Sequence, residues 1–318
     1  MKRLIKLISI IVVIIGLIVF ISFVNHKIKL KDEDALFKTN GKIVEVNGHH
    51  LNVYLSGNPN SDFTLVFMSG AGTCSPTLDF KTLYALFEKD YRIAVVEKAG
   101  YGFSDISDIS RDIDTILFET RESLNQAGVT NHKYILFPHS MSGIEALYWA
   151  NKYPDEIKGI VGLDLSVPAA YQNIKINTFL LSAAKFGADI GLTRFLPYLV
   201  DSSSAIKDGN LTEEEKELYR VIFYRRTATT SMINEAKMIK ANAKKLEEID
   251  TTNVPMLFFI SNGDGTGYSK EEWRSFGVGY LANKQNGKYQ FLDCSHYVHN
   301  IAYQQIFEES IKFINQLK

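Results

Sequence analysis

A stretch of strand, turn and helix at residues 134–154 constrains the fold of this chain more than any other feature. It reads YILFPHSMSGIEALYWANKYP. The apolar run from Tyr134 to Phe137 is typical of a buried strand, and the helix-forming residues after the turn continue without a break to Pro154. The sequence therefore predicts a strand that turns sharply into a helix, with Ser140 at the turn.

The position of Ser140 is that of a nucleophile. A serine at such a turn has its hydroxyl exposed at the end of the sheet, and the next N–H is free at the helix N-terminus to bind an oxyanion. Glycine usually stands two positions before and after this serine, whereas Pro138 and Ser142 stand there in this chain and Gly143 comes one later. Ser142 is the rival nucleophile, but its own second neighbour would be the bulky Ile144. A plain turn with a capping serine is the structural alternative.

Composition and charge narrow the class of protein. The 318 residues are enough for one large α/β domain with an insertion or for two ordinary domains. A net charge of −1 gives no indication of a nucleic-acid partner. Two cysteines, Cys74 and Cys294, are too few for a disulfide scaffold and lack the spacing of a zinc site, so we expect no metal. They form either one disulfide or two separate small buried side chains.

Residues 7–24 form an uncharged apolar run that is just long enough to cross a bilayer. Basic residues precede it, and no small-x-small cleavage site follows. We therefore expect a single-pass anchor in the cell membrane, with a cytoplasmic tail at 1–6 and a linker at 25–40. A short basic tail usually stays in the cytoplasm, which would place the catalytic body outside the cell. A cleaved signal and a buried core helix are the alternatives.

Strand and helix patterns alternate along residues 41–165. The segment opens with a hairpin around Asn47-Gly48, and buried strands then alternate with amphipathic helices. This alternation predicts an α/β fold with a mostly parallel central sheet flanked by helices. Residues 166–250 contain helical patterns and no convincing strand, so they are expected to form an inserted helical cap. The α/β core resumes over residues 251–318.

The candidate polar groups all follow predicted strands. Ser140 follows one strand, Asp264 a second and His296 a third. In an open parallel sheet, ligands bind at the edge formed by these strand ends. A glycine-rich segment, SGAGT at 69–73, follows another buried strand and can bring backbone N–H groups close to a ligand. It is not a phosphate-binding loop, because no GKS or GKT follows.

Five motifs occur in the order found in one superfamily. FMSGAGT is similar to an oxyanion loop, EKAGYGFSD to a D-R-x-G-x-G-x-S-D segment, and PHSMSG to a G-H-S-M-G-G elbow. Asp264 lies nine residues after Pro255, a common offset for the family acid, and CSHYVHN is similar to the segment that holds the family histidine. From Gly41 to Lys318, except for the helical insert, the chain resembles the α/β-hydrolase superfamily, in the form of a serine hydrolase with a helical cap.

The resemblance implies a role for each candidate residue. Ser140 would be the nucleophile and His296 its general base, while Asp264 would orient the imidazole and stabilise its charged form. The N–H groups of Ala71 and Met141 would bind the oxyanion. No cofactor is implied.

Asp164 is the alternative acid. It also follows a predicted strand, and some family members carry the acid after this earlier strand. The offset from Pro255 and the glycines on either side of Asp264 favour Asp264, because a tight turn there would direct its carboxylate toward His296. We expect Asp164 to brace the entry to the cap, and Glu97 and Lys98 to brace their own loop.

The expected function is that of a membrane-anchored serine hydrolase. Its substrate would be a small-molecule carboxylic ester, cleaved through an acyl-enzyme intermediate. A thioesterase, an aminopeptidase-type amidase or a non-catalytic binding protein of the same fold are the alternatives. A dehalogenase or an epoxide hydrolase is disfavoured, because these enzymes need an aspartate at the elbow.

The cap is rich in aromatic residues, which either line an apolar pocket or pack the cap on the sheet. They are Phe179, Phe186, Phe195, Tyr198, Tyr219, Phe223 and Tyr224.

Overall fold

Eight strands form one sheet in the computed structural model of the chain, which describes residues 1–318. They are β1 (Lys42–Val46), β2 (His49–Gly57), β3 (Thr64–Met68), β4 (Arg92–Glu97), β5 (Tyr134–Pro138), β6 (Ile157–Leu163), β7 (Met256–Ile260) and β8 (Gly287–Phe291). Their order in the sheet is β1-β2-β4-β3-β5-β6-β7-β8. Only the pairs made by β2 are antiparallel. The predicted mostly parallel sheet is confirmed.

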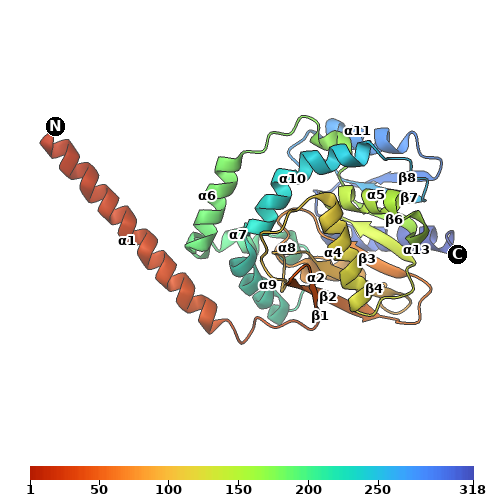
Figure 1. Cartoon of the computed structure of the whole chain (residues 1–318), viewed down its shortest axis with the longest axis horizontal. Helices are drawn as coiled ribbons and strands as arrows, with labels where there is room; N and C mark the ends of the chain where they lie inside the picture. The colour runs from red at the N-terminus through yellow and green to blue at the C-terminus, as the bar shows by residue number, and fades with distance from the viewer.

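Helices cover both faces of the sheet (Figure 1). The helices of the core are α2 (Pro76–Asp79), α3 (Lys81–Tyr84), α4 (Ile113–Gln126), α5 (Ser142–Lys152), α11 (Lys270–Leu281), α12 (Val298–Ile301) and α13 (Tyr303–Asn315), with the 3-10 helix η1 (Pro154–Glu156). Between β6 and β7 lie α6 (Thr178–Asp189), α7 (Tyr198–Asp201), α8 (Ser204–Lys207), α9 (Glu213–Arg226) and α10 (Thr230–Glu247), with the 3-10 helices η2 (Pro168–Tyr171) and η3 (Leu192–Phe195).

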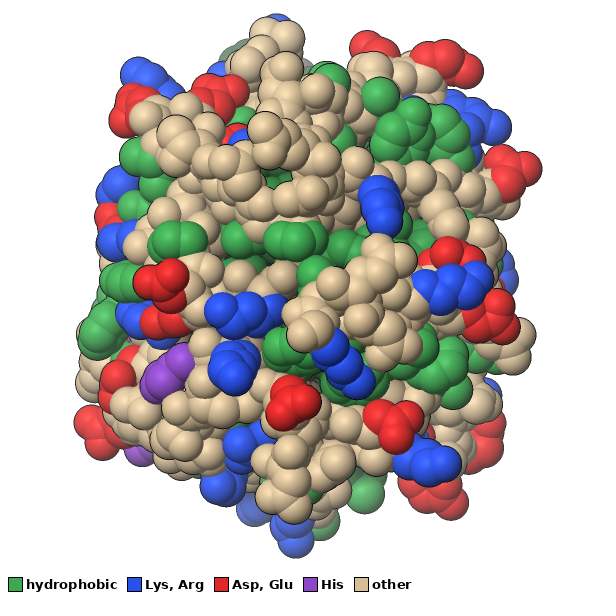
Figure 2. Space-filling model, turned by 90° about the vertical axis from the view of Figure 1, so that its right-hand side faces the viewer, with side chains coloured by type: hydrophobic (Ala, Val, Ile, Leu, Met, Phe, Trp, Pro, Cys, Tyr) green, Lys and Arg blue, Asp and Glu red, His purple; other side chains and the backbone are tan.

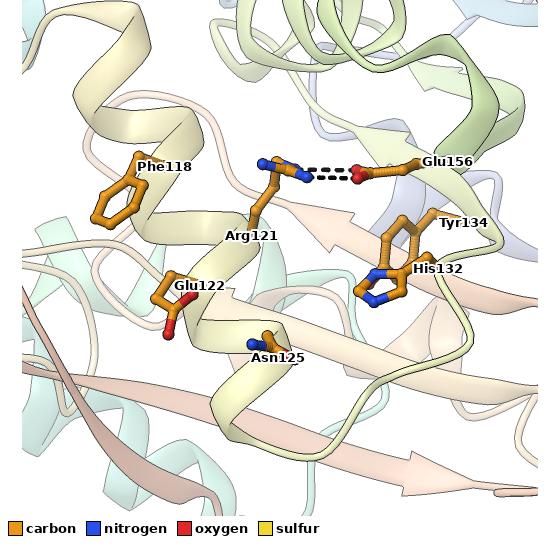
Figure 3. A pocket seen from close by; sticks show the side chains of 7 residues that line it. All are labelled: Phe118, Arg121, Glu122, Asn125, His132, Tyr134 and Glu156. Atoms are coloured by element: carbon orange, nitrogen blue, oxygen red, sulfur yellow. Dashed lines mark hydrogen bonds and ion pairs between the residues drawn. The ribbon is translucent and has the colours of Figure 1, made fainter.

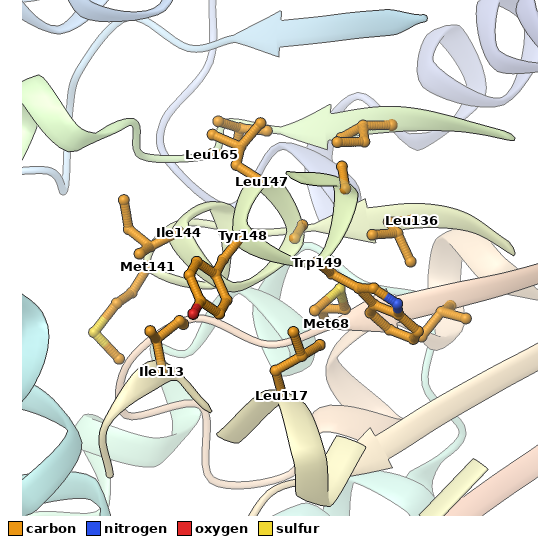
Figure 4. Close-up of a cluster of buried hydrophobic side chains, with 14 of the residues drawn as sticks. Met68, Ile113, Leu117, Leu136, Met141, Ile144, Leu147, Tyr148, Trp149 and Leu165 are labelled. Carbon is orange, nitrogen blue, oxygen red and sulfur yellow. The ribbon is translucent and has the colours of Figure 1, made fainter. Parts of the chain in front are cut away.

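The two faces of the sheet bury two separate hydrophobic clusters. Alternate residues of a strand point to opposite faces, so Leu65 and Phe67 join the cluster of α3 and α13, whereas Val66 and Met68 join that of α4 and α5. Figure 4 shows part of the second cluster, with Trp149 of α5 among its buried side chains. Burial on both faces explains why consecutive residues of β3, from Leu65 to Met68, are apolar.

Turns and helix starts that depend only on neighbouring residues are found where the sequence indicates them. Asn47 and Gly48 have φ values of 54° and 75°, as the turn of the β1–β2 hairpin requires. Thr212 and Glu215, whose spacing in the sequence is that of a capping box, form one at the start of α9. The segment 166–250 contains no strand, as predicted.

A buried ion pair holds the cap helix α10 on the core. Lys98, in the loop after β4, pairs with Glu235 of α10, and both side chains are buried. The Tyr101 hydroxyl donates to the other oxygen of Glu235 at 2.8 Å. Neighbouring Glu97 accepts from the Phe103 N–H at 2.7 Å, and burial raises the pKa of Glu97. The predicted bracing of this loop is confirmed for Glu97, and Lys98 braces the cap through Glu235.

Helix α1 (Lys2–Asp32) projects from the body, with only Ser22 and His26 buried (Figure 1). It is long and apolar enough to cross a membrane. The helix continues to Asp32, well into the segment 25–40 that the sequence predicted as a linker. This extension is held by the body, because Arg194 of η3 makes two hydrogen bonds to the Glu33 carboxylate, at 2.7 and 2.8 Å.

The cap aromatics divide into two groups. Tyr219 is buried, and Phe223 and Tyr224 pack against the same small cluster. Phe179, Phe186, Phe195 and Tyr198 are exposed, so for these four both predicted roles, lining a pocket and packing on the sheet, are wrong.

Both cysteines are free, so of the two alternatives for them the disulfide is wrong. Burial raises the pKa of the Cys74 thiol to about 12 and that of Cys294 to about 11. Neither thiol is therefore a nucleophile at neutral pH.

Candidate functional site

Ser140 lies at a strained and crowded turn between β5 and α5. Its φ of 54° is in the left-handed region. A Cβ added to Gly70 would lie 2.6 Å from the Ser140 Cβ, and one added to Gly143 would lie 2.3 Å from the carbonyl oxygen of Ser166. Gly70 lets the loop after β3 approach the turn, and Gly143 lets the first turn of α5 approach the segment after β6. Gly143 thus meets the need for a small residue after the serine, one position later than the usual pattern places it.

Ser142, the rival nucleophile, is buried, and its hydroxyl is hydrogen-bonded within the protein. Its hydroxyl is 2.6 Å from the Met68 carbonyl oxygen, to which it donates, and it accepts from the His139 N–H at 3.0 Å. It therefore ties the end of β3 to the turn. The Ser140 hydroxyl makes no hydrogen bond within the protein and lines a cavity, so it is free to meet a substrate.

His296 lies in the loop after β8 and lines the same cavity as Ser140. Its Nδ1 is 2.6 Å from Oδ2 of Asp164, and both side chains are buried. This hydrogen bond orients the imidazole with its other nitrogen, Nε2, free for a second partner.

The prediction that Asp264 would contact His296 is wrong. Asp264 is exposed, and its carboxylate accepts from the Asn262 side chain at 3.1 Å. Its carbonyl oxygen, rather than its carboxylate, accepts from the His296 N–H at 2.9 Å. The glycine-rich turn does bring this segment to the histidine loop, but it presents backbone and directs the acid toward solvent.

Asp164 immediately follows β6 and has a φ of 52°, in the left-handed region. Its Oδ1 accepts from the Ser261 N–H and from the Trp273 ring N–H, each at 2.7 Å. Two donors on one oxygen and His296 on the other stabilise the buried carboxylate. The sequence offered Asp164 as the alternative acid, but no pattern in it marked Ser261 or Trp273 as partners.

Two backbone N–H groups are unoccupied beside Ser140. Neither the N–H of Ala71 nor that of Met141 donates to any atom of the protein, and both residues line the cavity. A pair of free backbone donors next to a candidate nucleophile is the arrangement of an oxyanion hole. The structure thus brings four of the five predicted site residues together, and Asp264 is the exception.

The cavity has a volume of about 250 Å³ and mostly apolar walls. The core supplies Trp273 and Tyr268, and the cap supplies Ile239 from α10 together with Ile174 and Ile176 from the segment before α6. A small apolar group next to Ser140 would be shielded from water there.

His139 lies beneath the site, between the rings of His296 and His299. Its Nε2 is 3.1 Å from the His296 carbonyl oxygen, so it supports the histidine loop. Burial lowers the pKa of His139 well below its usual range, and the ring is therefore neutral. His299 is paired with Asp79 at 2.8 Å, away from the cavity. Neither histidine lines the cavity, so neither is a candidate for the reaction.

A second hollow lies at the opposite end of β5 (Figure 3). Arg121 of α4 and Glu156 of η1 face each other across it, and Tyr134 and His132 lie at one side. The arginine and the glutamate satisfy each other, and no nucleophile lines the hollow. It is therefore not a candidate for the chemistry described here.

Two proteins of Bacillus subtilis strain 168 are similar to the chain in sequence. The uncharacterized protein YbdG is 34% identical over an alignment of 328 positions, which covers all of both chains. The uncharacterized protein YqjL is 26% identical over 247 residues, which cover 76% of this chain and 79% of YqjL. No protein-family model matches the chain.

Solved structures share the fold at low sequence identity. Cfl2 of Burkholderia cenocepacia has a TM-score of 0.68 at 14% identity, with 86% of this chain and 95% of Cfl2 covered. The haloalkane dehalogenase DbeA of Bradyrhizobium elkani USDA94 has a TM-score of 0.63 at 13% identity, with coverage of 87% and 97%. A candidate lipase, lip1 of Acinetobacter baumannii AYE, has a TM-score of 0.62 at 14% identity, with coverage of 92% and 96%. At these identities the likeness concerns the fold alone.

The contrast between the two serines of the turn predicts different effects on stability. Ser142→Ala should lower the free energy of unfolding by about 1 kcal/mol, because it removes the buried hydroxyl that joins β3 to the turn. Ser140→Ala should change it by less than about 0.5 kcal/mol, because that hydroxyl has no partner. Urea unfolding followed by tryptophan fluorescence measures both. Equal stability of the two variants would contradict the assigned contacts.

Proposed function

Because the chain belongs to the α/β-hydrolase superfamily, we propose that it is a serine hydrolase that cleaves carboxylic esters through an acyl-enzyme intermediate. One observation supports this proposal above the others. The imidazole of His296, held by the Asp164 carboxylate, and the unbonded hydroxyl of Ser140 line one apolar cavity. A protein that only bound a ligand would not need this set of groups in one place.

Each group has a defined part in the reaction. Ser140 Oγ attacks the ester carbonyl carbon while His296 Nε2 takes its proton, and Asp164 stabilises the imidazolium that results. The N–H groups of Ala71 and Met141 donate to the oxyanion, and each such donor contributes on the order of 3 kcal/mol in the transition state. His296 then gives the proton to the leaving alcohol. Water, activated by the same imidazole, releases the acid and restores Ser140.

The residue at the elbow separates this chain from the dehalogenases that share its fold. A dehalogenase of this fold attacks its substrate with an aspartate at the elbow. This chain has Ser140 there, and a serine hydroxyl needs the neighbouring base that His296 supplies. Ester hydrolysis therefore fits the residues better than dehalogenation does.

We further propose that α1 anchors the enzyme in the cell membrane, with the catalytic body outside the cytoplasm. Nearly every side chain of α1 is exposed, and its apolar run is long enough to span the hydrocarbon core. A helix of this composition has no partner in the protein for most of its length. The lipid bilayer is the environment that suits it.

The nucleophile can be tested directly. Ser140→Ala should abolish both labelling by a fluorophosphonate probe and hydrolysis of short-chain esters, because the attacking oxygen is absent. Ser142→Ala is the matched control and should still be labelled. Gel fluorescence and a panel of esters, thioesters and aminoacyl amides measure these effects and the acyl preference. Undiminished labelling of Ser140→Ala would place the nucleophile elsewhere.

The two candidate acids can be separated by amide substitutions. Asp164→Asn should lower kcat by as much as ~10⁴, because an amide favours the wrong tautomer of the imidazole. Asp264→Asn should keep near wild-type activity, since its carboxylate faces solvent. Circular dichroism checks that both variants are folded. Loss of activity in Asp264→Asn alone would reverse the assignment.

The anchor predicts how the protein fractionates. The full-length chain should stay in the membrane pellet after alkaline carbonate washing, whereas a chain that begins near Asp32 should be released. Protease added to cells whose wall has been removed should digest the catalytic body. A natural N-terminus near residue 25, read by mass spectrometry, would instead indicate a cleaved signal.

A further inference from the structure

The cap exposes eight large apolar side chains between residues 179 and 199. We call this set the cap face. Its members are Phe179, Leu180, Phe186, Leu192, Phe195, Leu196, Tyr198 and Leu199. Phe179 is the extreme case, with 82% of its surface exposed. Single exposed apolar residues are common on soluble proteins, but eight within 21 residues mark an interaction surface.

Helix α6, which carries much of the cap face, is scarcely packed against the protein. Only Ala188 of its twelve residues is buried. A helix of this length is marginally stable in water by itself, and most helical stability comes from packing an apolar face. A surface outside the protein must therefore supply the missing contacts.

The charges in this stretch are already neutralised. Lys185 and Asp189 are paired with each other along α6, and Arg194 is paired with Glu33 at the end of α1. The opposite side of the body is different. Figure 2 shows that face, on which Lys and Arg side chains are interspersed with Asp and Glu side chains. The absence of free charge favours an apolar partner for the cap face.

The cap face is continuous with α1. The Ser22 hydroxyl, inside the apolar run of α1, donates to the carbonyl oxygen of Ile190 just after α6, at 2.6 Å. A Cβ added to Gly191 would lie 2.4 Å from the His26 Cβ, so the cap meets α1 at backbone distance. Figure 1 shows α6 on the side of the body from which α1 projects. A bilayer that holds α1 up to Ser22 therefore reaches the level of α6.

Given the anchored hydrolase proposed above, on which this inference rests, we propose that the cap face docks onto the bilayer leaflet from which α1 emerges. Its aromatic and aliphatic side chains lie at the boundary between headgroups and acyl chains. Burial of apolar side-chain area at this boundary strengthens membrane binding. The segment that leads into α6 lines the cavity of Ser140 through Ile174 and Ile176. Docking therefore brings the cavity beside the lipid, and its substrates are membrane-borne esters.

Lipid contact can be read from a tryptophan placed in the cap face. The full-length Phe179→Trp variant is reconstituted in vesicles of phosphatidylethanolamine and phosphatidylglycerol with or without brominated acyl chains. Its added emission should be blue-shifted and quenched by the brominated lipid. Tyr289→Trp is the matched control, because Tyr289 is an exposed aromatic residue of β8, on the far side of the body from α1 (Figure 1). Its emission should be unaffected.

The outcomes distinguish this inference from the proposals that precede it. Protein that resists carbonate washing but shows no quenching at position 179 would overturn docking alone; a second copy covering the cap face would give this result. Protein that carbonate removes would overturn both the anchor and the docking. Fluorophosphonate labelling at Ser140, measured in the same vesicles, reports on the hydrolase separately.

The link between docking and substrate has its own test. The double variant Phe179→Ser, Phe186→Ser should hydrolyse a long-chain ester in vesicles several-fold more slowly than the wild type, while its turnover of a water-soluble short-chain ester stays unchanged. Neither residue lines the cavity. Tyr289→Ser should match the wild type on both substrates. If the double variant lost activity equally on both substrates, or lost none on either, the proposal that substrate comes from the membrane would be overturned.

Discussion

The close approach of backbone segments at the turn after β5 is the constraint on which the site depends. Gly70 and Gly143 have no side chain at points where a Cβ would meet backbone or Ser140 itself. The neighbouring segments can therefore pack closely around Ser140, whose left-handed conformation costs a residue other than glycine about 1–2 kcal/mol. The contacts around the turn, including the buried Ser142 hydroxyl, hold the strained residue in place.

The buried charged side chains of this protein hold other groups in position. The Asp164 carboxylate accepts from Ser261, Trp273 and His296, so it is stabilised while it holds the imidazole. The Lys98–Glu235 pair plays a comparable part for the cap, because separating it would leave two uncompensated buried charges. The cap helix that forms one wall of the cavity is thus attached by a geometrically demanding contact, which fixes its place over the sheet.

The distribution of apolar surface gives the molecule two unlike sides. The side away from α1 carries charges of both signs interspersed among polar and apolar side chains, whereas α6 and α7 expose large apolar side chains beside α1. The cavity lies between the strand ends and the cap, close to the segment that leads into α6. The anchor, the cap face and the cavity therefore follow one another on the same side of the body. This arrangement would bring the cavity close to the membrane that holds α1.

The sequence alone determined the features that depend on neighbouring residues. Strand alternation, the Asn47-Gly48 hairpin, the capping box of α9 and the turn at Ser140 are local, because each follows from spacing along the chain. The choice of Asp164 over Asp264 was decided only by tertiary structure. Both acids follow strands, and their neighbours do not reveal which carboxylate faces His296 once the strands are side by side. The exposure of the cap aromatics was likewise invisible in sequence, because an apolar residue that packs inside and one that faces outside have the same composition.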